Sequence, residues 1–358
     1  MKTRSLLTVL FLLLPMTAYP QNLLPRKDLA FAQVVAGGGF ETILNVTNRG
    51  TTTYNGVLNL FHGTGQSWSP LVNGNPITDG KLNIALTKDT TAAFRITSTT
   101  GIDAGCAVIV ASGLEQTNFL EGTLTYYITS GTTLTDSVGV QPSGEFYISR
   151  LPFDDFHSLA LALVNANTAK ANVQLTVFSN TNAQLGSFSL PLESNQYSAQ
   201  YLYQLFPGVQ VAAGRLEIQS DLPIFGTALT DKGGQFSSLP LLPAIKAYTF
   251  SASVSGISFS GELGFWIDGP HVQGYLRTLM INGVPETQID TLIVGGNFVD
   301  KVLQFYASGR PDPEQLLSYG IVNQFSPSAA TQQGTVTFWL LSSLSLVGQG
   351  TVTLTAIN

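Results

Sequence analysis

Few side chains in this chain suit catalysis or metal binding: three histidines, one cysteine and scattered acids. His62, His157 and His271 are far apart, so a Ser-His-Asp triad would have to assemble one of them with a distant serine and acid. No GxSxG segment is present to hold a strained nucleophilic serine, and no HExxH motif or cysteine cluster is present to bind zinc. The sequence therefore predicts no catalytic residues, no metal and no cofactor.

Two short segments contain the highest density of metal-ligand side chains. Asp154-Asp155-Phe156-His157 could offer Asp and His to a metal, and Asp268-Gly269-Pro270-His271 combines the same residue types. Asp-Gly and Gly-Pro favour turns, and connecting loops are commonly polar. We therefore interpret the first segment as a solvated loop, the second as a turn, and His62-Gly63-Thr64-Gly65 as a hairpin tip.

Cys106 is the single cysteine, so it cannot form an internal disulfide. It begins the apolar run Cys106–Ala111, and no His or cation lies near it in the sequence to lower the pKa of its thiol. We expect a small buried hydrophobic residue.

Trp266, Tyr275 and Trp339 are the candidate ligand-binding residues. Aromatic rings combine a wide apolar area with a polar tip, which suits contact with sugar rings or with protein. Both tryptophans are out of phase with the apolar alternation of their segments, seen for example in Leu263 and Ile267, so they should face the opposite side. Burial under a loop or at a domain interface explains the pattern equally well.

The first 20 residues are predicted to be a secretory signal peptide. Lys2 and Arg4 precede the apolar run Leu6–Leu14, which is too short to span a bilayer, and Ala18 is a plausible cleavage point. Without these two cations the net charge of −6 becomes −8, which argues against nucleic acid or an anionic membrane surface as a partner. We expect an exported product without membrane insertion, whether extracellular, at the cell surface or periplasmic.

The elements that carry these side chains are predicted to be strands. Runs rich in Val, Ile, Thr, Phe and Tyr alternate with Gly, Asn and Asp turns. The strands predicted in the first domain are Phe31–Ala36, Glu41–Asn48, Asn55–His62, Lys81–Thr87, Thr91–Thr97, Gly105–Ser112, Phe119–Thr129 and Thr133–Val140. The spacing of Tyr197, Tyr201 and Leu205 instead predicts a short helix, which Pro207-Gly208 would end.

The chain contains an internal duplication. Thr42–Phe61 and Leu159–Phe178 align without a gap. The alignment places Leu44, Val46, Asn48, Asn55, Leu58 and Phe61 on Leu161, Leu163, Asn165, Asn172, Leu175 and Phe178. Duplicated framework residues with no duplicated reactive cluster indicate copied architecture rather than copied chemistry.

The segments GGGF, YLYQLFPG, GRLEIQSDLPIFGTAL and VGVQP resemble a tandem immunoglobulin-like β-sandwich repeat of exported bacterial proteins that has no established activity. The resemblance covers roughly residues 30–243 and implies fold and export, without catalytic residues. The first copy lacks a counterpart of the LFPG segment.

We therefore expect an all-β chain of three domains: sandwich repeats at 30–143 and 144–245, then an antiparallel sandwich or partly closed barrel at 248–358. The expected function is non-enzymatic structure, adhesion or binding at or outside the cell surface, with an unknown protein or polysaccharide as partner. Carbohydrate binding through Trp266, Tyr275 and Trp339 is the alternative. A hydrolase with sequence-distant residues is a third possibility, which the scarcity of histidines disfavours.

Overall fold

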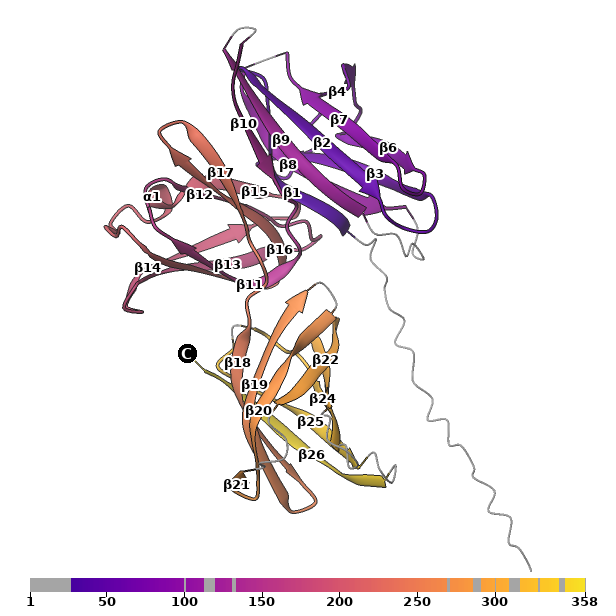
Figure 1. The fold of residues 1–358 in the computed structure, drawn as a ribbon, viewed down its shortest axis with the longest axis vertical. Coiled ribbons are helices and arrows are strands. Elements are labelled where there is room, and N and C mark those ends of the chain that lie inside the picture. The colour runs from indigo at the N-terminus through magenta and orange to yellow at the C-terminus, as the bar shows by residue number, and fades with distance from the viewer. Residues whose placement is uncertain are drawn as a thin grey trace, which may run out of the picture.

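The computed structural model describes residues 27–99, 101–112, 120–130, 133–268, 271–285, 291–299, 301–308, 316–327, 329–340 and 345–357. The predicted signal peptide, residues 1–20, lies outside these ranges. Within them the chain is β-structure apart from one four-residue helix, and it forms three units in sequence order (Figure 1). In this part of the chain, no helix combines the length and apolarity needed to cross a membrane.

The first unit consists of two antiparallel sheets around one core. Its strands are β1 (Lys27–Ala36), β2 (Phe40–Asn48), β3 (Tyr54–His62), β4 (Leu71–Val72), β5 (Asn75–Pro76), β6 (Lys81–Leu86), β7 (Thr91–Thr97), β8 (Asp103–Ala111), β9 (Leu120–Ser130) and β10 (Thr133–Val140). The sheet orders are β1-β8-β3-β6 and β10-β9-β2-β7-β4-β5. Leu44 and Ile96 from one sheet and Leu58 and Ile109 from the other are fully buried in the shared core.

The second unit is a curled sheet built on one long strand. Its elements are β11 (Phe146–Phe153), β12 (Leu159–Val164), β13 (Ala171–Ser179), β14 (Gln184–Leu192), β15 (Tyr197–Tyr201), α1 (Leu202–Leu205), β16 (Gly214–Lys232) and β17 (Gln235–Pro240). The first half of β16 pairs with β11 and β13, and the second half pairs with β12 and β17. The sheet curls into a half-barrel around buried residues such as Leu161, Leu175 and Ile218.

The two units share one pairing scheme. In the first unit β8 pairs with β1 and β3, and β9 pairs with β2 and β10. The halves of β16 make the same partnerships with β11 and β13, and with β12 and β17. One continuous strand in the second unit therefore corresponds to two separate strands in the first, so the duplication seen in the sequence extends to the connectivity of the sheets.

All eight strands predicted for the first domain match described strands, from β1 to β10, and only the short strands β4 and β5 were missed. The predicted helix is wrong in its first half. Tyr197–Tyr201 is strand β15, where Tyr201 pairs with Ala160 of β12, and only Leu202–Leu205 is helical. The strand ladder with β12 satisfies the backbone there and outweighs the helical spacing of the side chains.

The third unit is a closed barrel, not the predicted sandwich or partly closed barrel. Its strands are β18 (Lys246–Val254), β19 (Ile257–Asp268), β20 (His271–Ile281), β21 (Val284–Pro285), β22 (Thr291–Val299), β23 (Val302–Ser308), β24 (Leu316–Val322), β25 (Thr331–Leu340) and β26 (Ser345–Ala356). β18 pairs with β26, and β19 pairs with both β18 and β20, so eight antiparallel strands close the cylinder. Closure leaves these strands no free edge.

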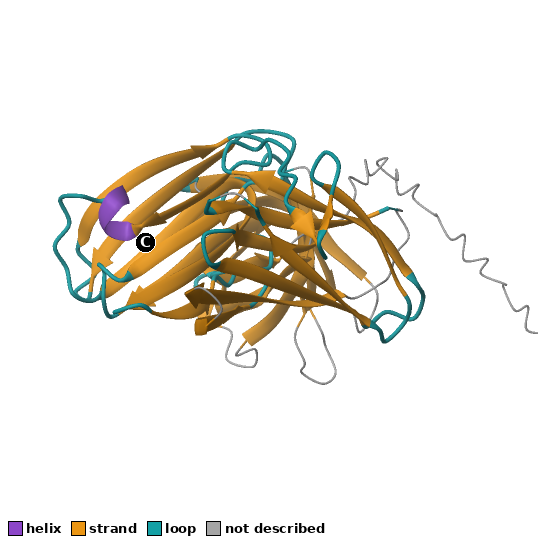
Figure 2. Cartoon of the chain, turned by 90° about the horizontal axis from the view of Figure 1, so that it is seen from above, coloured by secondary structure: helices purple, strands orange, loops and turns teal. Residues whose placement is uncertain are grey.

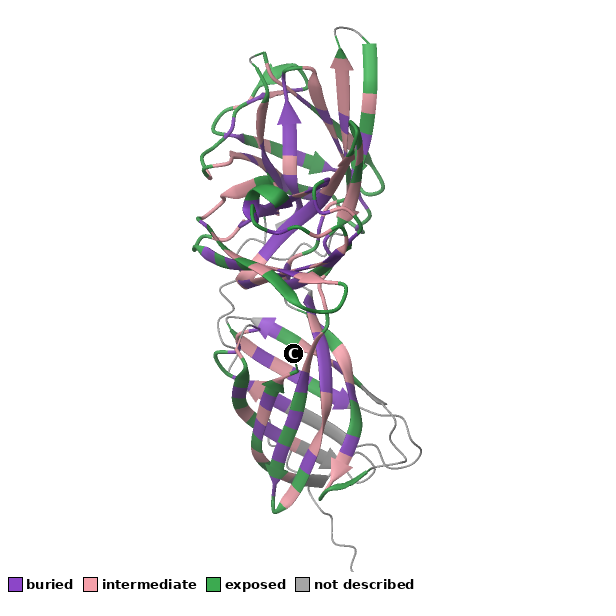
Figure 3. Ribbon diagram, turned by 90° about the vertical axis from the view of Figure 1, so that its left-hand side faces the viewer, coloured by how far each residue is buried: buried purple, intermediate pink, exposed green. Residues whose placement is uncertain are grey.

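Side chains alternate between the inside and the outside of the barrel, as the bands of buried and exposed residues in Figure 3 show. Leu263, Phe265 and Ile267 of β19 point inward, as their spacing predicts. They meet other buried residues such as Phe250 and Phe305. An eight-stranded barrel is just wide enough for side chains to fill it, so the barrel is a packed core and a rigid support for residues on its outer face.

Apolar contacts join the three units, in which strands predominate (Figure 2). Ala32 of β1 and Cys106 of β8 pack with Val164 of β12 and Phe225 of β16, and all four are buried. Tyr147 of β11 lies edge-on against Phe298 of the barrel, with ring centroids 5.0 Å apart. The second unit therefore contacts both neighbours through side chains.

Candidate functional site

His62 is the only histidine that meets an acid from another element among the described residues. Its Nδ1 lies 3.4 Å from Asp103 Oδ1, and the Trp68 indole donates to Asp103 Oδ2 at 2.8 Å. Asp103 Oδ1 also accepts from the backbone N–H of Ala104 at 2.9 Å. His62 lies at the predicted hairpin turn, where its backbone N–H donates to Gln66 O. These contacts anchor the turn on β8, which is a structural role.

His157 lies in the loop before β12, as predicted, and it is exposed. Asp155 Oδ1 accepts from the backbone N–H groups of His157 at 3.1 Å and Ser158 at 3.3 Å, so the carboxylate holds the loop. Burial raises the pKa of Asp155, but the bonds from Ser158 and His157 outweigh it and lower the pKa overall. The His157 ring lies 6.0 Å from that of Tyr203.

His271 begins β20 and is exposed on the barrel. Gly269 and Pro270 lie outside the described residues, so the predicted turn is not described beyond its two ends. The three histidines thus belong to three different units. In the described ranges, no group of three or more His, Cys, Asp or Glu side chains is arranged to hold a metal ion.

Cys106 is fully buried between the first and second units, and burial raises the pKa of its thiol to about 12. A thiol in that environment is protonated at neutral pH and unreactive. The predicted role of a small buried hydrophobic residue is confirmed.

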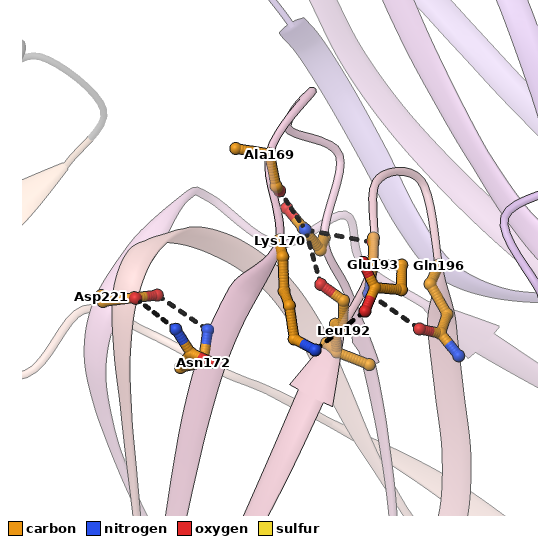
Figure 4. Close-up of polar contacts among 8 residues, drawn as sticks. Ala169, Lys170, Asn172, Leu192, Glu193, Gln196 and Asp221 are labelled. Carbon is orange, nitrogen blue, oxygen red and sulfur yellow. Dashed lines mark hydrogen bonds and ion pairs between the residues drawn. The ribbon is translucent and has the colours of Figure 1, made fainter.

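The duplicated asparagines hold loops in the two related units. Asn48 and Asn165 are both fully buried. Asn165 Nδ2 donates to the carbonyls of Ala169 at 2.8 Å, Leu192 at 2.9 Å and Glu193 at 3.1 Å, the contacts drawn in Figure 4. Asn48 Nδ2 donates in the same way to Thr52 O at 2.8 Å and Leu86 O at 2.9 Å. Asn48 and Asn165, which were copied with the framework, therefore satisfy backbone groups.

The three predicted ligand-binding residues belong to three different strands of the barrel, β19, β20 and β25. Trp266 in β19 is half-buried and, with Tyr147 and Lys246, borders a cavity of about 10 Å³ where the second unit meets the barrel. Such a cavity holds one water molecule at most. Trp339 lies in β25, separated from β19 by β18 and β26, and its side chain is not described.

The register also places the two tryptophans toward opposite ends of the barrel. Trp266 follows Phe265, which pairs with Lys246, the first residue of β18. Because the start of β18 pairs with the end of β26, Trp266 lies near the end of the barrel where β26 ends. Trp339 pairs with Leu346, near the start of β26. Of the three predicted residues, only Trp266 and Tyr275 lie on adjoining strands.

Tyr275 and a second tyrosine that the sequence analysis did not single out, Tyr306, lie over glycines on the outer face of the barrel. Tyr275 of β20 is opposite Gly264 of β19, and Tyr306 of β23 is opposite Gly295 of β22. A Cβ added at either glycine would collide with ring atoms of the paired tyrosine. Each ring therefore leans across its glycine and covers the bare backbone, an arrangement that fixes its position.

Apolar and amide side chains complete this surface. Ile293 of β22 pairs with Tyr275 and is 71% exposed, and Tyr306 is 47% exposed. Gln273 lies opposite Gly295, beside the Tyr306 ring, and Asn297 lies opposite Gln304. We call the set Tyr275, Ile293, Tyr306, Gln273, Asn297 and Gln304 the outer strip; it crosses β20, β22 and β23.

Two charges at the border of the outer strip, on Glu262 and Arg277, are paired. Arg277 donates to Glu262 Oε1 at 2.7 Å, and Tyr275 Oη donates to the same oxygen at 3.1 Å. The Arg277 guanidinium lies 5.1 Å from the centre of the Tyr275 ring. Burial first, and then the hydrogen bond to Glu262, raise the pKa of Tyr275, so the phenol stays neutral and holds its position.

A larger open depression of about 370 Å³ lies on the first unit, lined by residues such as Asn45, Thr47, Thr123 and Glu121. Glu121 is paired with Arg49 at 2.9 Å. The lining residues include no other titratable group, so the depression lacks the two tuned groups that acid–base chemistry requires.

Comparison with known proteins gives no match: no family model, no curated protein and no solved structure matches the chain. The resemblance of residues 30–243 to immunoglobulin-like repeats therefore stays a prediction. The structure shows an all-β chain of several antiparallel sheets with a closed barrel as its third unit.

Proposed function

We propose that this chain is an exported, non-enzymatic binding protein that acts at or outside the cell surface, and that the outer strip is its contact surface. The observation that carries the proposal is the group of Tyr275, Ile293 and Tyr306 on neighbouring strands of a packed barrel, in which Ile293 and Tyr306 are exposed and Tyr275 is half-buried. Apolar side chains that gather on one exposed face commonly mark an interaction site.

The first and second units are proposed to be immunoglobulin-like sandwich repeats that support and present the barrel. Their common pairing scheme and the loop-holding roles of Asn48 and Asn165 support this assignment. They bury apolar side chains such as Phe225 against each other, which suits a stiff support. The proposal of a non-enzymatic protein rests on the structural roles of His62, Asp103 and Asp155 described above.

The test is attachment of the purified mature protein, carrying a fluorescent label, to the envelope of the cells that produce it. Ile293→Lys places a charge in the middle of the outer strip and should abolish attachment. Leu185→Lys is the matched control, since Leu185 is 40% exposed on β14 of the second unit, away from the barrel. Equal attachment by both variants, or no attachment by the unaltered protein, would refute the proposal.

Carbohydrate binding by the barrel is the second candidate function. The Tyr306 ring held over Gly295 favours it, because a ring that covers a glycine with one face leaves the other face for a flat apolar partner. The Tyr275 ring, which the Arg277 guanidinium approaches to 5.1 Å, offers a smaller apolar area beside it. Trp266 and Trp339, two of the residues predicted from the sequence, are not part of this carbohydrate-binding surface. The residues that carry it are Tyr275 and Tyr306.

A further inference from the structure

We propose that the outer strip binds a linear, uncharged glycan that runs across β20, β22 and β23. This inference rests on the proposed function and names the chemical class of its ligand. Three features of the strip carry it: the spacing of the rings, the amides between them, and the balance of charge.

The two tyrosines lie on strands separated by one strand, β22. Two strand spacings amount to about 10 Å, so one chain can contact both tyrosines only if it is extended and has several sugar units. Ile293, 71% exposed, lies on the intervening strand and offers an apolar contact between them. A single sugar could meet one ring at most.

The amide side chains supply hydrogen bonds for hydroxyl groups. Gln273 and Asn297 are exposed and Gln304 is half-buried. Among the described residues, none forms a hydrogen bond with these three side-chain amides. Each amide offers two donors and one acceptor, which matches the mixed donor and acceptor character of a sugar hydroxyl. Apolar faces flanked by uncommitted amides suit a polyhydroxylated ring better than a purely apolar partner.

The pairing of Glu262 with Arg277 favours an uncharged ligand. Glu262 and Arg277 at the border of the strip neutralise each other across 2.7 Å, so neither is a free charge for an anionic or cationic polymer. A neutral ligand held by stacking and amides should bind equally well at low and high salt, because screening weakens only interactions between charges.

The experiment is affinity electrophoresis of the full mature chain through gels that contain neutral polysaccharides (hydroxyethylcellulose, xylan, mannan, laminarin, dextran) or anionic ones (alginate, polygalacturonate). At least one neutral polymer should retard the protein, equally with and without added salt. Titration calorimetry with oligosaccharides of that polymer should then show affinity rising from the disaccharide to the hexasaccharide.

Tyr306→Ala should weaken binding roughly five- to tenfold, and Tyr306→Trp should restore it, because the ring face is what the sugar contacts. Tyr203→Ala is the matched control: Tyr203 is 40% exposed, against 47% for Tyr306, and lies in the second unit. Circular dichroism of each variant confirms that the barrel is folded.

Three outcomes would overturn the inference: no retardation by any neutral polymer, retardation by anionic polymers alone, or equal binding by Tyr306→Ala and Tyr203→Ala. If the neutral polymers fail while Ile293→Lys still abolishes attachment to the envelope, the glycan assignment is wrong and the proposed binding function stands. If that attachment is also insensitive to Ile293→Lys, both are wrong.

Discussion

Replacing Asn165 by alanine tests whether the duplicated polar residues are structural. The side chain is fully buried, and its two N–H groups serve three backbone carbonyls at 2.8–3.1 Å. Its Oδ1 also accepts from the backbone N–H of Asn167 at 3.0 Å. Alanine removes all of these bonds and brings in no replacement donor.

A buried polar group left without a partner costs about 1–3 kcal/mol. With two donors removed, the free energy of unfolding of the second unit should fall by about 2–4 kcal/mol. Asn48→Ala should have a comparable effect on the first unit, since Asn48 bonds Thr52 O and Leu86 O in the same way. The matched control is Asn172→Ala: it is also a duplicated asparagine, but its side chain bonds the exposed carboxylate of Asp221, so its cost should stay below about 1 kcal/mol.

Hydrogen exchange of the full mature chain, read by mass spectrometry, is the appropriate assay because a three-unit protein has no single two-state unfolding curve. Core amides of β13 and β16 should exchange about 30- to 800-fold faster in Asn165→Ala, while the barrel is unaffected. The reasoning is refuted if Asn165→Ala and Asn172→Ala behave alike. It is also refuted if Asn165→Ala accelerates exchange equally in all three units.

Three further predictions concern the core and the junctions. Cys106 has a pKa of about 12 through burial, so it should resist a thiol reagent at pH 8 until denaturant is added; labelling of the native protein would contradict this. Tyr147→Ala removes an edge-on ring contact of 5.0 Å with Phe298, so small-angle scattering should show a wider spread of distances between the barrel and the second unit; an unchanged curve would contradict this. For Glu217, burial raises the pKa but the hydrogen bond from Arg150 at 2.8 Å outweighs it, leaving the pKa below 4.5. A carboxylate whose pKa is lower in the folded state than in the unfolded state stabilises the fold at any pH above its unfolded-state pKa, and this stabilisation is lost as the pH falls through the folded-state pKa. Glu217→Gln should therefore reduce the loss of stability that urea titrations measure below pH 4.5. Parallel pH profiles for the variant and the unaltered protein would argue against this.

Strands of the first unit such as β2 could be predicted because they bury one face. In β2 every second residue from Thr42 is buried, including Leu44 and Val46, and that period is visible in the sequence. The closure of the barrel could not be predicted in the same way. It depends on the register of β18 with β26, for example Phe250 with Leu354, and local alternation carries no information about a partner a hundred residues away.

The outer strip was predicted only in part. The sequence indicates Tyr275 as a candidate, whereas Tyr306 has no neighbouring tryptophan to mark it. A signal was present: Leu303, Phe305 and Ala307 are buried, and Tyr306 interrupts them on the opposite face. Its pairing with Gly295 is a cross-strand relation, which becomes visible only when the register is known.

The arrangement of the three units explains why the contact surface is expected on the barrel. The two related units use outer-face residues against each other: Ala162 and Val164 of β12 meet Ala30 and Ala32 of β1. Strands β10 and β17 are likewise joined by the bond from Ser238 Oγ to Gly139 O at 2.6 Å. The barrel contacts Tyr147 of the second unit, and its face across β20, β22 and β23 stays exposed. The exposed side chains of Tyr306 and Ile293 therefore lie on the surface of a packed barrel. A surface on such a core can hold its rings in place before a ligand arrives, which lowers the entropy lost on binding.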